Sequence, residues 1–277
     1  MLTPASEIIK EEREELNSII VSGIRTSIQS EGVGQTPIVL VHGAAYNHTL
    51  WRKQMPVLSS LSKTMAVDLP GHGESATFAA GQLVSVKSYT DHIHTILSML
   101  SASTTILVGH SMGGAISMRF ALDYPDKVKA LVLIGTGAKL GVNPAIIEGL
   151  SKNFKQAIRT GVAAWSYAQK TDRSIIQEGI NEMVKCKQEV AIADFKACND
   201  FDIREHVSQI GLPTLIIVGD EDKLTPVKWS EYLRKNIRNS QLKVISGAGH
   251  MIMHEKPDEV DECIGTFVKN TIKVKKT

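Results

Sequence analysis

One serine stands where an apolar run gives way to a helical pattern. The sequence GHSMGG at residues 109–114 directly follows the apolar run 105–108 and directly precedes a helical pattern that begins at Ala115. Small glycines allow the sharp strand-to-helix turn that lifts a serine hydroxyl into a cleft. The backbone N–H of Met112 then lies at a helix N-terminus, where it can donate to an oxyanion. The pattern therefore predicts a nucleophilic serine, Ser111.

A serine hydroxyl is a poor nucleophile near neutral pH unless a base takes its proton. Of the nine histidines, His250 stands in the glycine-rich loop 246–250 behind the last predicted strand, at the same sheet edge as Ser111. His110 adjoins the serine but is expected to point elsewhere on the tight turn. His254 lies one helical turn beyond His250 and is expected to be structural. His250 is therefore the predicted base.

A third group must orient the imidazole and stabilise its charged form. Three carboxylates compete for this role, because the sequence GDED at residues 219–222 follows the preceding strand. Asp220 lies nearly at the strand end, where we expect it to hold the loop backbone. Asp222 lies further into the loop and can reach toward His250. Spacing therefore favours Asp222, and the chain order serine, aspartate, histidine agrees with a strained serine turn that comes first.

Short apolar runs must position these side chains. Each run is largely continuous rather than alternating, which is typical of strands buried on both faces. Helical patterns such as residues 86–100 and 115–122 separate the runs. This alternation predicts the α/β class, with a mostly parallel central sheet and helices on both of its faces. The six runs are residues 37–41, 64–67, 105–108, 128–134, 215–218 and 242–245.

The alternation stops between residues 138 and 210. Apolar side chains recur there at intervals of three and four from Ile147 to Trp165, and the stretch is too long for a plain loop. We expect a helical lid that lines the substrate pocket through Phe154, Trp165 and Met183. The expected division is an N-terminal helix (6–16) and hairpin (18–29) within residues 1–35, an α/β core at 36–137 and 211–277, and the lid at 138–210.

Together these segments resemble the α/β-hydrolase superfamily from about residue 36 to residue 268. The resemblance implies the α/β-hydrolase fold with a helical cap insertion, and it favours Asp222 over Asp220 as the acid. It also implies that the backbone amides of Ala44 and Met112 form an oxyanion hole. The matching motifs are HG at 42–43, DLPGHGES at 68–75, GHSMGG at 109–114, GDEDKLTP at 219–226 and GH at 249–250.

The resemblance sets some subfamilies aside and leaves others open. Haloalkane dehalogenases and epoxide hydrolases place an aspartate where this chain has Ser111, and HGGG lipases differ from the sequence HGAA at residues 42–45. Carboxylesterases, perhydrolase-like enzymes and carbon–carbon bond hydrolases remain similar. We expect a carboxylesterase-like enzyme that cleaves small, largely apolar esters through a Ser-His-Asp triad and an acyl-enzyme. The alternatives are carbon–carbon or perhydrolase chemistry, or a non-catalytic ligand receptor.

The amino-acid composition limits the kinds of partner that the chain is expected to bind. The chain has 277 residues and 43% hydrophobic residues, which fits a globular protein. Its formal net charge of only +2 gives no strong positive potential that would attract nucleic acid. Three cysteines without a CxxC pair favour a reducing compartment and supply no zinc ligand set. We find no secretory signal and no run of about 18 apolar residues, so we expect a cytoplasmic protein without a membrane partner. No cofactor or metal is implied. The sequence leaves undecided whether the protein forms a homodimer.

Overall fold

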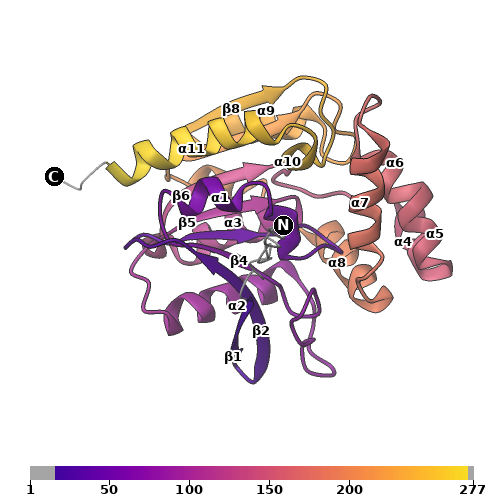
Figure 1. The fold of residues 1–277 in the computed structure, drawn as a ribbon, viewed down its shortest axis with the longest axis horizontal. Coiled ribbons are helices and arrows are strands. Elements are labelled where there is room, and N and C mark those ends of the chain that lie inside the picture. The colour runs from indigo at the N-terminus through magenta and orange to yellow at the C-terminus, as the bar shows by residue number, and fades with distance from the viewer. Residues whose placement is uncertain (1–15, 274–277) are drawn as a thin grey trace, which may run out of the picture.

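The computed structural model describes residues 16–273 and contains one eight-stranded sheet (Figure 1). The strand order is β1-β2-β4-β3-β5-β6-β7-β8. Strand β2 is antiparallel to both neighbours, and every other pair is parallel, so the predicted mostly parallel sheet is confirmed. The strands are β1 (Leu16–Val21), β2 (Ile24–Glu31), β3 (Ile38–Val41), β4 (Thr64–Val67), β5 (Thr105–His110), β6 (Val128–Ile134), β7 (Thr214–Gly219) and β8 (Ser240–Ile245).

Helices cover both faces of the sheet, as the continuous apolar strands predicted. Side chains alternate along β3: Val39 and Val41 pack with helices of one face, whereas Ile38 and Leu40 pack with helices of the other. The first face carries α2 (Val86–Met99), α3 (Met112–Asp123) and α9 (Val227–Asn236). The second carries α1 (Met55–Ser59) and α11 (Pro257–Lys273). Short helices η1 (His48–Trp51), η2 (Pro125–Lys127), η4 (Val207–Gln209) and α10 (Ile252–Glu255) complete the connections.

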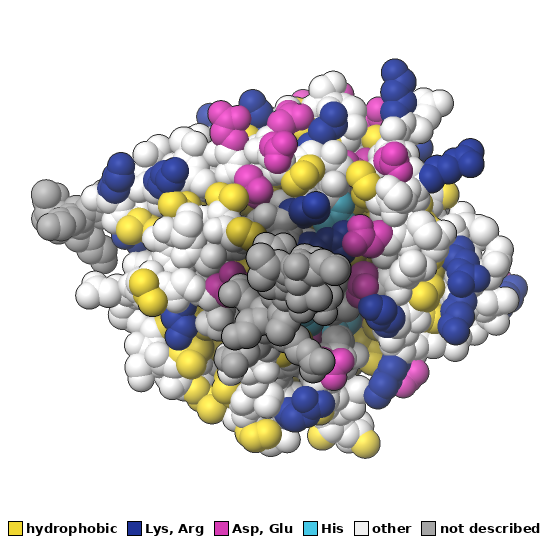
Figure 2. Space-filling view, in the orientation of Figure 1, with side chains coloured by type: hydrophobic (Ala, Val, Ile, Leu, Met, Phe, Trp, Pro, Cys, Tyr) yellow, Lys and Arg dark blue, Asp and Glu magenta, His cyan; other side chains and the backbone are white. Residues whose placement is uncertain are grey.

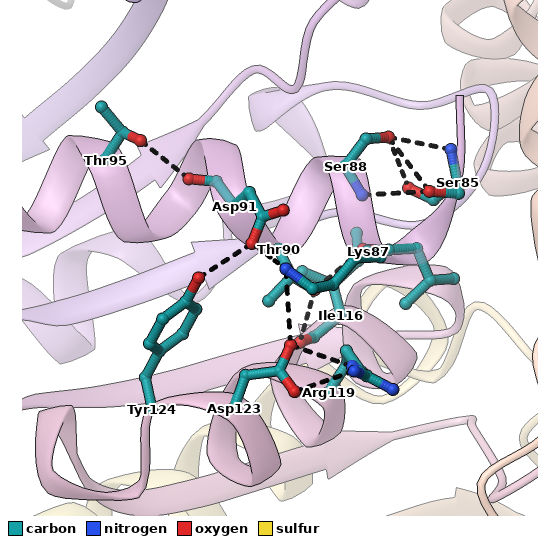
Figure 3. A network of polar contacts seen from close by, with 11 residues as sticks. Ser85, Lys87, Ser88, Thr90, Asp91, Thr95, Ile116, Arg119, Asp123 and Tyr124 are labelled. Carbon is teal, nitrogen blue, oxygen red and sulfur yellow. Dashed lines mark hydrogen bonds and ion pairs between the residues drawn. The ribbon is translucent and has the colours of Figure 1, made fainter. Parts of the chain in front are cut away.

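A polar network holds α2 against α3 on the outer surface (Figure 3). The Tyr124 hydroxyl donates to Asp91 at 2.9 Å, and the Lys87 ammonium pairs with the same carboxylate. Arg119 pairs with Asp123 one helical turn later, at 2.9 Å. These exposed ion pairs contribute little individually, so buried apolar contacts dominate the packing of the two helices.

The segment between β6 and β7 is helical, and we call residues 138–210 the helical insertion. In Figure 1 its helices gather at one side of the molecule, beyond the strand ends. The apolar stripe from Ile147 to Trp165 is divided among several helices, because Asn153 ends one helix and its side chain accepts the amide of Gln156 to begin the next. The elements are α4 (Pro144–Lys152), α5 (Phe154–Gln156), the π-helical η3 (Ala157–Val162), α6 (Ala163–Ser166), α7 (Arg173–Met183) and α8 (Gln188–Asp200).

The N-terminal region begins with a hairpin. Strands β1 and β2 pair antiparallel, and their turn places Ser22 and Gly23 at positive φ. The expected helix at 6–16 lies outside the described residues except for Leu16, which begins β1. Within residues 16–273, every helix is too short or too polar to traverse a lipid bilayer. Both signs of charge occur on the face shown in Figure 2.

Candidate active site

Ser111 lies at the sharp turn between β5 and α3. Its φ is 53°, in the left-handed region that is costly for a residue with a side chain. The neighbouring glycines make the turn sterically feasible. A Cβ at Gly109 would lie 2.2 Å from the carbonyl oxygen of Gly113, and a Cβ at Gly113 would lie 2.0 Å from the carbonyl oxygen of Val41. The motif at residues 109–114 therefore builds the predicted strained turn.

The parallel register brings three loops to one edge of the sheet. His110 at the end of β5 pairs with Ile134, and Gly219 at the end of β7 pairs with Ile245. Because β5 to β8 are parallel neighbours, the loops that follow β5, β7 and β8 leave at the same edge. These loops carry Ser111, Asp222 and His250.

Asp222 and His250 form a buried pair. The Oδ2 atom of Asp222 lies 2.9 Å from Nδ1 of His250. Burial alone would raise the pKa of the Asp222 carboxyl, but the charge and hydrogen bond of His250, together with the hydrogen bonds from Thr225, lower that pKa to about 2. Asp222 is therefore a carboxylate that holds the ring of His250 by one nitrogen. The other ring nitrogen, Nε2, is then available to exchange a proton with another group.

Two residues that the sequence analysis did not single out support this pair. The Thr225 hydroxyl donates to Oδ2 of Asp222 at 2.7 Å, and the Thr225 amide donates to Oδ1 at 2.8 Å. Gly135, at φ 51°, passes beside the pair, and a Cβ there would lie 3.3 Å from both Oδ2 of Asp222 and Nδ1 of His250. Thr225 could have been found from the sequence, because it lies three residues after Asp222 in the motif at 219–226. Gly135 could not, because only the neighbouring position of β6 in the folded sheet brings it to the pair.

Asp220 has a different environment from Asp222. It is exposed, and it accepts hydrogen bonds from the Ser246 hydroxyl at 2.8 Å and from the Gly247 amide at 2.7 Å. Asp220 thus ties the end of β7 to the loop behind β8. This geometry agrees with the role that its position at the strand end suggested.

The other nearby histidines are buried and bonded to backbone oxygens. The expectation that His110 points elsewhere is wrong, because its Nε2 lies 3.0 Å from the carbonyl oxygen of His250 and the two rings are 4.6 Å apart. Burial and the neighbouring His250 lower the pKa of His110 well below its usual value, so a neutral ring donates this bond. His254 donates to the carbonyl of Leu50 at 2.9 Å, and burial lowers its pKa to about 4. His254 is structural, as expected.

The amides of Ala44 and Met112 are available as donors. Neither amide donates a hydrogen bond to any other residue in the described part of the chain. The next amide along the loop, that of Ala45, is instead bound by Oδ2 of Asp194 at 2.9 Å. Ala44 borders the same two cavities as Ser111. Met112 borders neither cavity, but it follows Ser111 directly in the chain. Both amides therefore have no partner in the described residues, as the donors of an oxyanion site require.

Two cavities meet at Ser111. The smaller, of about 40 Å³, is bordered by His250 and Met183, and the larger, of about 150 Å³, is bordered by Trp165. Of the three side chains expected to contact substrate, Phe154 borders neither cavity, because it packs into the hydrophobic core of the insertion. Phe195 of α8 borders both cavities and was not singled out as a pocket residue.

The sequence model of the alpha/beta hydrolase family matches residues 38–262. Since this match spans most of the chain, the protein belongs to the alpha/beta hydrolase family.

Two relatives and one solved structure indicate the range of similar proteins. A 2-hydroxy-6-oxo-2,4-heptadienoate hydrolase of Pseudomonas putida is 30% identical over 86% of this chain and 90% of its own length. A pimeloyl-(acyl-carrier protein) methyl ester esterase of Pectobacterium carotovorum is 26% identical over 87% of this chain and 97% of its own. The structure of a thermophilic esterase is 35% identical, with a TM-score of 0.80, over 93% of this chain and 98% of its own. The fold and these neighbours support a hydrolase.

Proposed function

We propose that this protein is a serine hydrolase that cleaves small, largely apolar carboxylic esters. The observation that carries the proposal is the convergence of four features on one small cavity. Ser111 and His250 both border it, Asp222 contacts Nδ1 of that histidine, and Ala44, whose amide has no acceptor within the described residues, also borders it. In this proposal the helical insertion acts as a lid over the site.

The reaction has two halves, formation of an acyl-enzyme and its hydrolysis, and the same catalytic groups act in both. Oγ of Ser111 attacks the ester carbonyl carbon while Nε2 of His250 takes the hydroxyl proton, and the amides of Ala44 and Met112 stabilise the oxyanion. The bond to the alkoxy oxygen then breaks, and His250 gives its proton to the departing alcohol. Water attacks the acyl-enzyme by the same route and regenerates Ser111. Asp222 orients the imidazole and stabilises its charged form throughout.

The two cavities divide the ester between them. The departing alcohol must lie beside His250, which protonates it, and His250 borders only the cavity of about 40 Å³. Since a single water needs about 10–15 Å³, that cavity holds a group of one to three heavy atoms. The acyl chain then occupies the larger cavity of about 150 Å³. An apolar cavity of that size accommodates about six carbons. We therefore expect short alkyl esters of medium-length acids.

The relatives support two reactions. An esterase named for a methyl ester agrees with the small alcohol cavity, whereas a dienoate hydrolase favours the carbon–carbon alternative. A dienoate carries a carboxylate, which calls for a cation in the pocket. Lys223 is the one charged side chain bordering either cavity within the described chain, and it is exposed. The apolar walls therefore favour an uncharged ester.

The test is hydrolysis of methyl hexanoate, measured as acid release with a pH indicator. Wild-type protein should turn over, and Ser111→Ala should lose at least about 10⁴-fold of kcat while keeping its circular dichroism spectrum. Retained turnover by Ser111→Ala would refute the assignment. Turnover of a vinylogous diketone acid far above every ester would establish carbon–carbon hydrolysis instead. Saturable binding of esters without any turnover would establish a receptor.

Two variants test the division of the ester. Met183 borders only the small cavity and Trp165 only the large one. Met183→Ala should raise the rate on butyl hexanoate relative to methyl hexanoate and leave acyl preference unchanged. Trp165→Ala should raise the rate on methyl decanoate relative to methyl hexanoate and leave alcohol preference unchanged. The opposite pairing of variants and preferences would mean that the acyl and alcohol sites are exchanged.

A further inference from the structure

A buried aspartate of the helical insertion joins three distant parts of the core. Asp194 on α8 is fully buried, as is the His72 side chain that it contacts. Its Oδ2 accepts the Ala45 amide at 2.9 Å and lies 2.7 Å from Nε2 of His72. Its Oδ1 accepts the Tyr89 hydroxyl at 2.7 Å. Three chain segments of the core therefore converge on one carboxylate of α8.

The charges at this point are balanced within the cluster. Burial opposes a charge on His72, but the Asp194 carboxylate outweighs it and raises the pKa of His72 well above its usual value. Burial, followed by Asp194, raises the pKa of Tyr89, so that its hydroxyl remains a donor. Hydrogen bonds to a charged partner are stronger than neutral ones. Asp194 is thus held firmly and can in turn hold the Ala45 amide.

Ala45 needs such a partner. Its φ is 56°, a left-handed conformation that L-residues other than glycine rarely adopt, and its side chain is buried. Its amide would be an unpaired buried donor if Asp194 were absent. The contact offsets both costs and so fixes the backbone of the loop. The preceding peptide carries the Ala44 amide, whose direction depends on this same backbone.

We propose that Asp194 is a positioning residue for the oxyanion site: through Ala45 it holds the Ala44 amide toward the space beside Ser111. This inference rests on the proposed esterase function. It also gives the insertion a role beyond covering the site, because α8 supplies Asp194 together with Phe195, which borders both cavities. The oxyanion site is then complete only when α8 is packed against the core.

The discriminating variant is Asp194→Asn, assayed on methyl hexanoate and on the matching thionoester. An oxyanion site built for oxygen favours the ester, and loss of one donor costs about 10²–10³-fold in kcat. We expect kcat for the ester to fall about 10- to 100-fold with KM nearly unchanged. The thionoester should lose much less, so the ratio of ester to thionoester rates should fall at least about fivefold. A general loss of folded protein would lower both rates equally.

Three matched variants separate positioning from stability. Asp172→Ala removes the N-cap of α7 in the same insertion, so it destabilises the insertion without touching Asp194. Tyr89→Phe removes one donor to Asp194 and leaves the Ala45 contact in place. Both should keep the wild-type ester-to-thionoester ratio. Ala45→Gly relieves the left-handed strain, so adding it to Asp194→Asn should restore part of the lost kcat.

An unchanged ratio in Asp194→Asn, with a lower melting temperature, would overturn the proposal and leave Asp194 a purely structural group. A second measurement does not depend on turnover. The ¹H–¹⁵N resonances of the Ala44 and Ala45 amides should shift in Asp194→Asn and stay in place in Asp172→Ala. If wild-type protein hydrolyses no ester, the proposed function fails, and these resonances still decide the role of Asp194: an unshifted Ala44 resonance refutes it.

Discussion

Two of the three buried Asp–His pairs within residues 16–273 have similar separations, but they differ in what the second ring nitrogen of the histidine contacts. His250 contacts Asp222 through Nδ1 at 2.9 Å, and its ring borders the cavity beside Ser111. His72 contacts Asp194 through Nε2 at 2.7 Å, and its Nδ1 lies 3.2 Å from the carbonyl oxygen of Pro70. Both nitrogens of His72 are therefore bonded to acceptors, which favours the protonated ring.

The contrast shows that a carboxylate partner does not by itself make a histidine a base. A general base needs a nitrogen within reach of the proton it takes and a neutral form at the working pH. His250 borders the cavity beside Ser111, and its Nδ1 is the ring nitrogen that contacts Asp222. His72 has two bonded nitrogens, a raised pKa and a fully buried side chain. In the proposed reaction the pair of His250 and Asp222 serves proton transfer, whereas we propose that the pair of His72 and Asp194 positions the backbone.

The largest expected effect comes from replacing each histidine by glutamine. His250→Gln removes the proposed base, so kcat on methyl hexanoate should fall about 10⁴- to 10⁶-fold while the protein keeps its folded spectrum. His72→Gln keeps a donor to Asp194, so kcat should stay within about tenfold while the free energy of unfolding falls by about 1–3 kcal/mol. Steady-state kinetics and urea unfolding measure both. Equal kinetic losses in the two variants would abolish the distinction.

A second pair of variants tests which carboxylate serves His250. Asp222→Asn should lower kcat about 10³- to 10⁴-fold, because the amide favours the wrong tautomer of the ring. Asp220→Asn should stay within about twofold of wild type, since exposed side chains tolerate such changes. The control is the folded spectrum of both proteins. If Asp220→Asn proves the more damaging, the acid has been misassigned.

The pH dependence of stability should have opposite signs for the two pairs. The pKa of Asp222 falls from 3.8 to about 2 on folding, so its contribution of about 2 kcal/mol is present above about pH 4 and lost as the pH falls toward 2. The pKa of His72 is raised above 6.5, so its contribution is present below that pH and lost as the pH rises.

Urea unfolding between pH 3 and pH 10 measures these contributions as differences from wild type. The difference between wild type and Asp222→Asn should shrink toward acid. The difference between wild type and Asp194→Asn should shrink toward alkali, because His72 loses its raised pKa in that variant. If both differences in unfolding free energy shrink in the same direction of pH, the two pairs do not differ as we propose, with a charged His72 and a proton-exchanging His250.

Local sequence was enough to predict the sheet and the strained turn. Each apolar run from 37–41 to 242–245 overlaps one strand, and the glycines at 109 and 113 have the steric reason that the motif implied. The stripe from Ile147 to Trp165 predicted helix correctly but not its division. The stripe is divided between α4 and α5 because the Asn153 side chain caps α5. A single residue carries this signal, so the apolar spacing does not reveal it.

Contacts between distant segments were out of reach. The bond between Ala45 and Asp194 joins positions 149 residues apart, and the bond between His110 and His250 joins positions 140 apart. A buried acidic residue on a helix looks like a solvated one until the neighbouring element is known. For the same reason Phe154 was expected at the pocket, although apolar spacing alone cannot separate a pocket wall from the core of the insertion.

In the proposed reaction, Ser111 is the nucleophile of an acyl-transfer site. The most direct test of this role is inactivation with an ethyl p-nitrophenyl alkylphosphonate, followed by mass spectrometry of the peptides. We predict one phosphonyl adduct per chain, on the peptide that contains Ser111, with parallel loss of methyl hexanoate hydrolysis and no adduct in Ser111→Ala. Full hydrolytic activity in a protein that carries the adduct, or an adduct on another residue that accounts for the inactivation, would contradict this account.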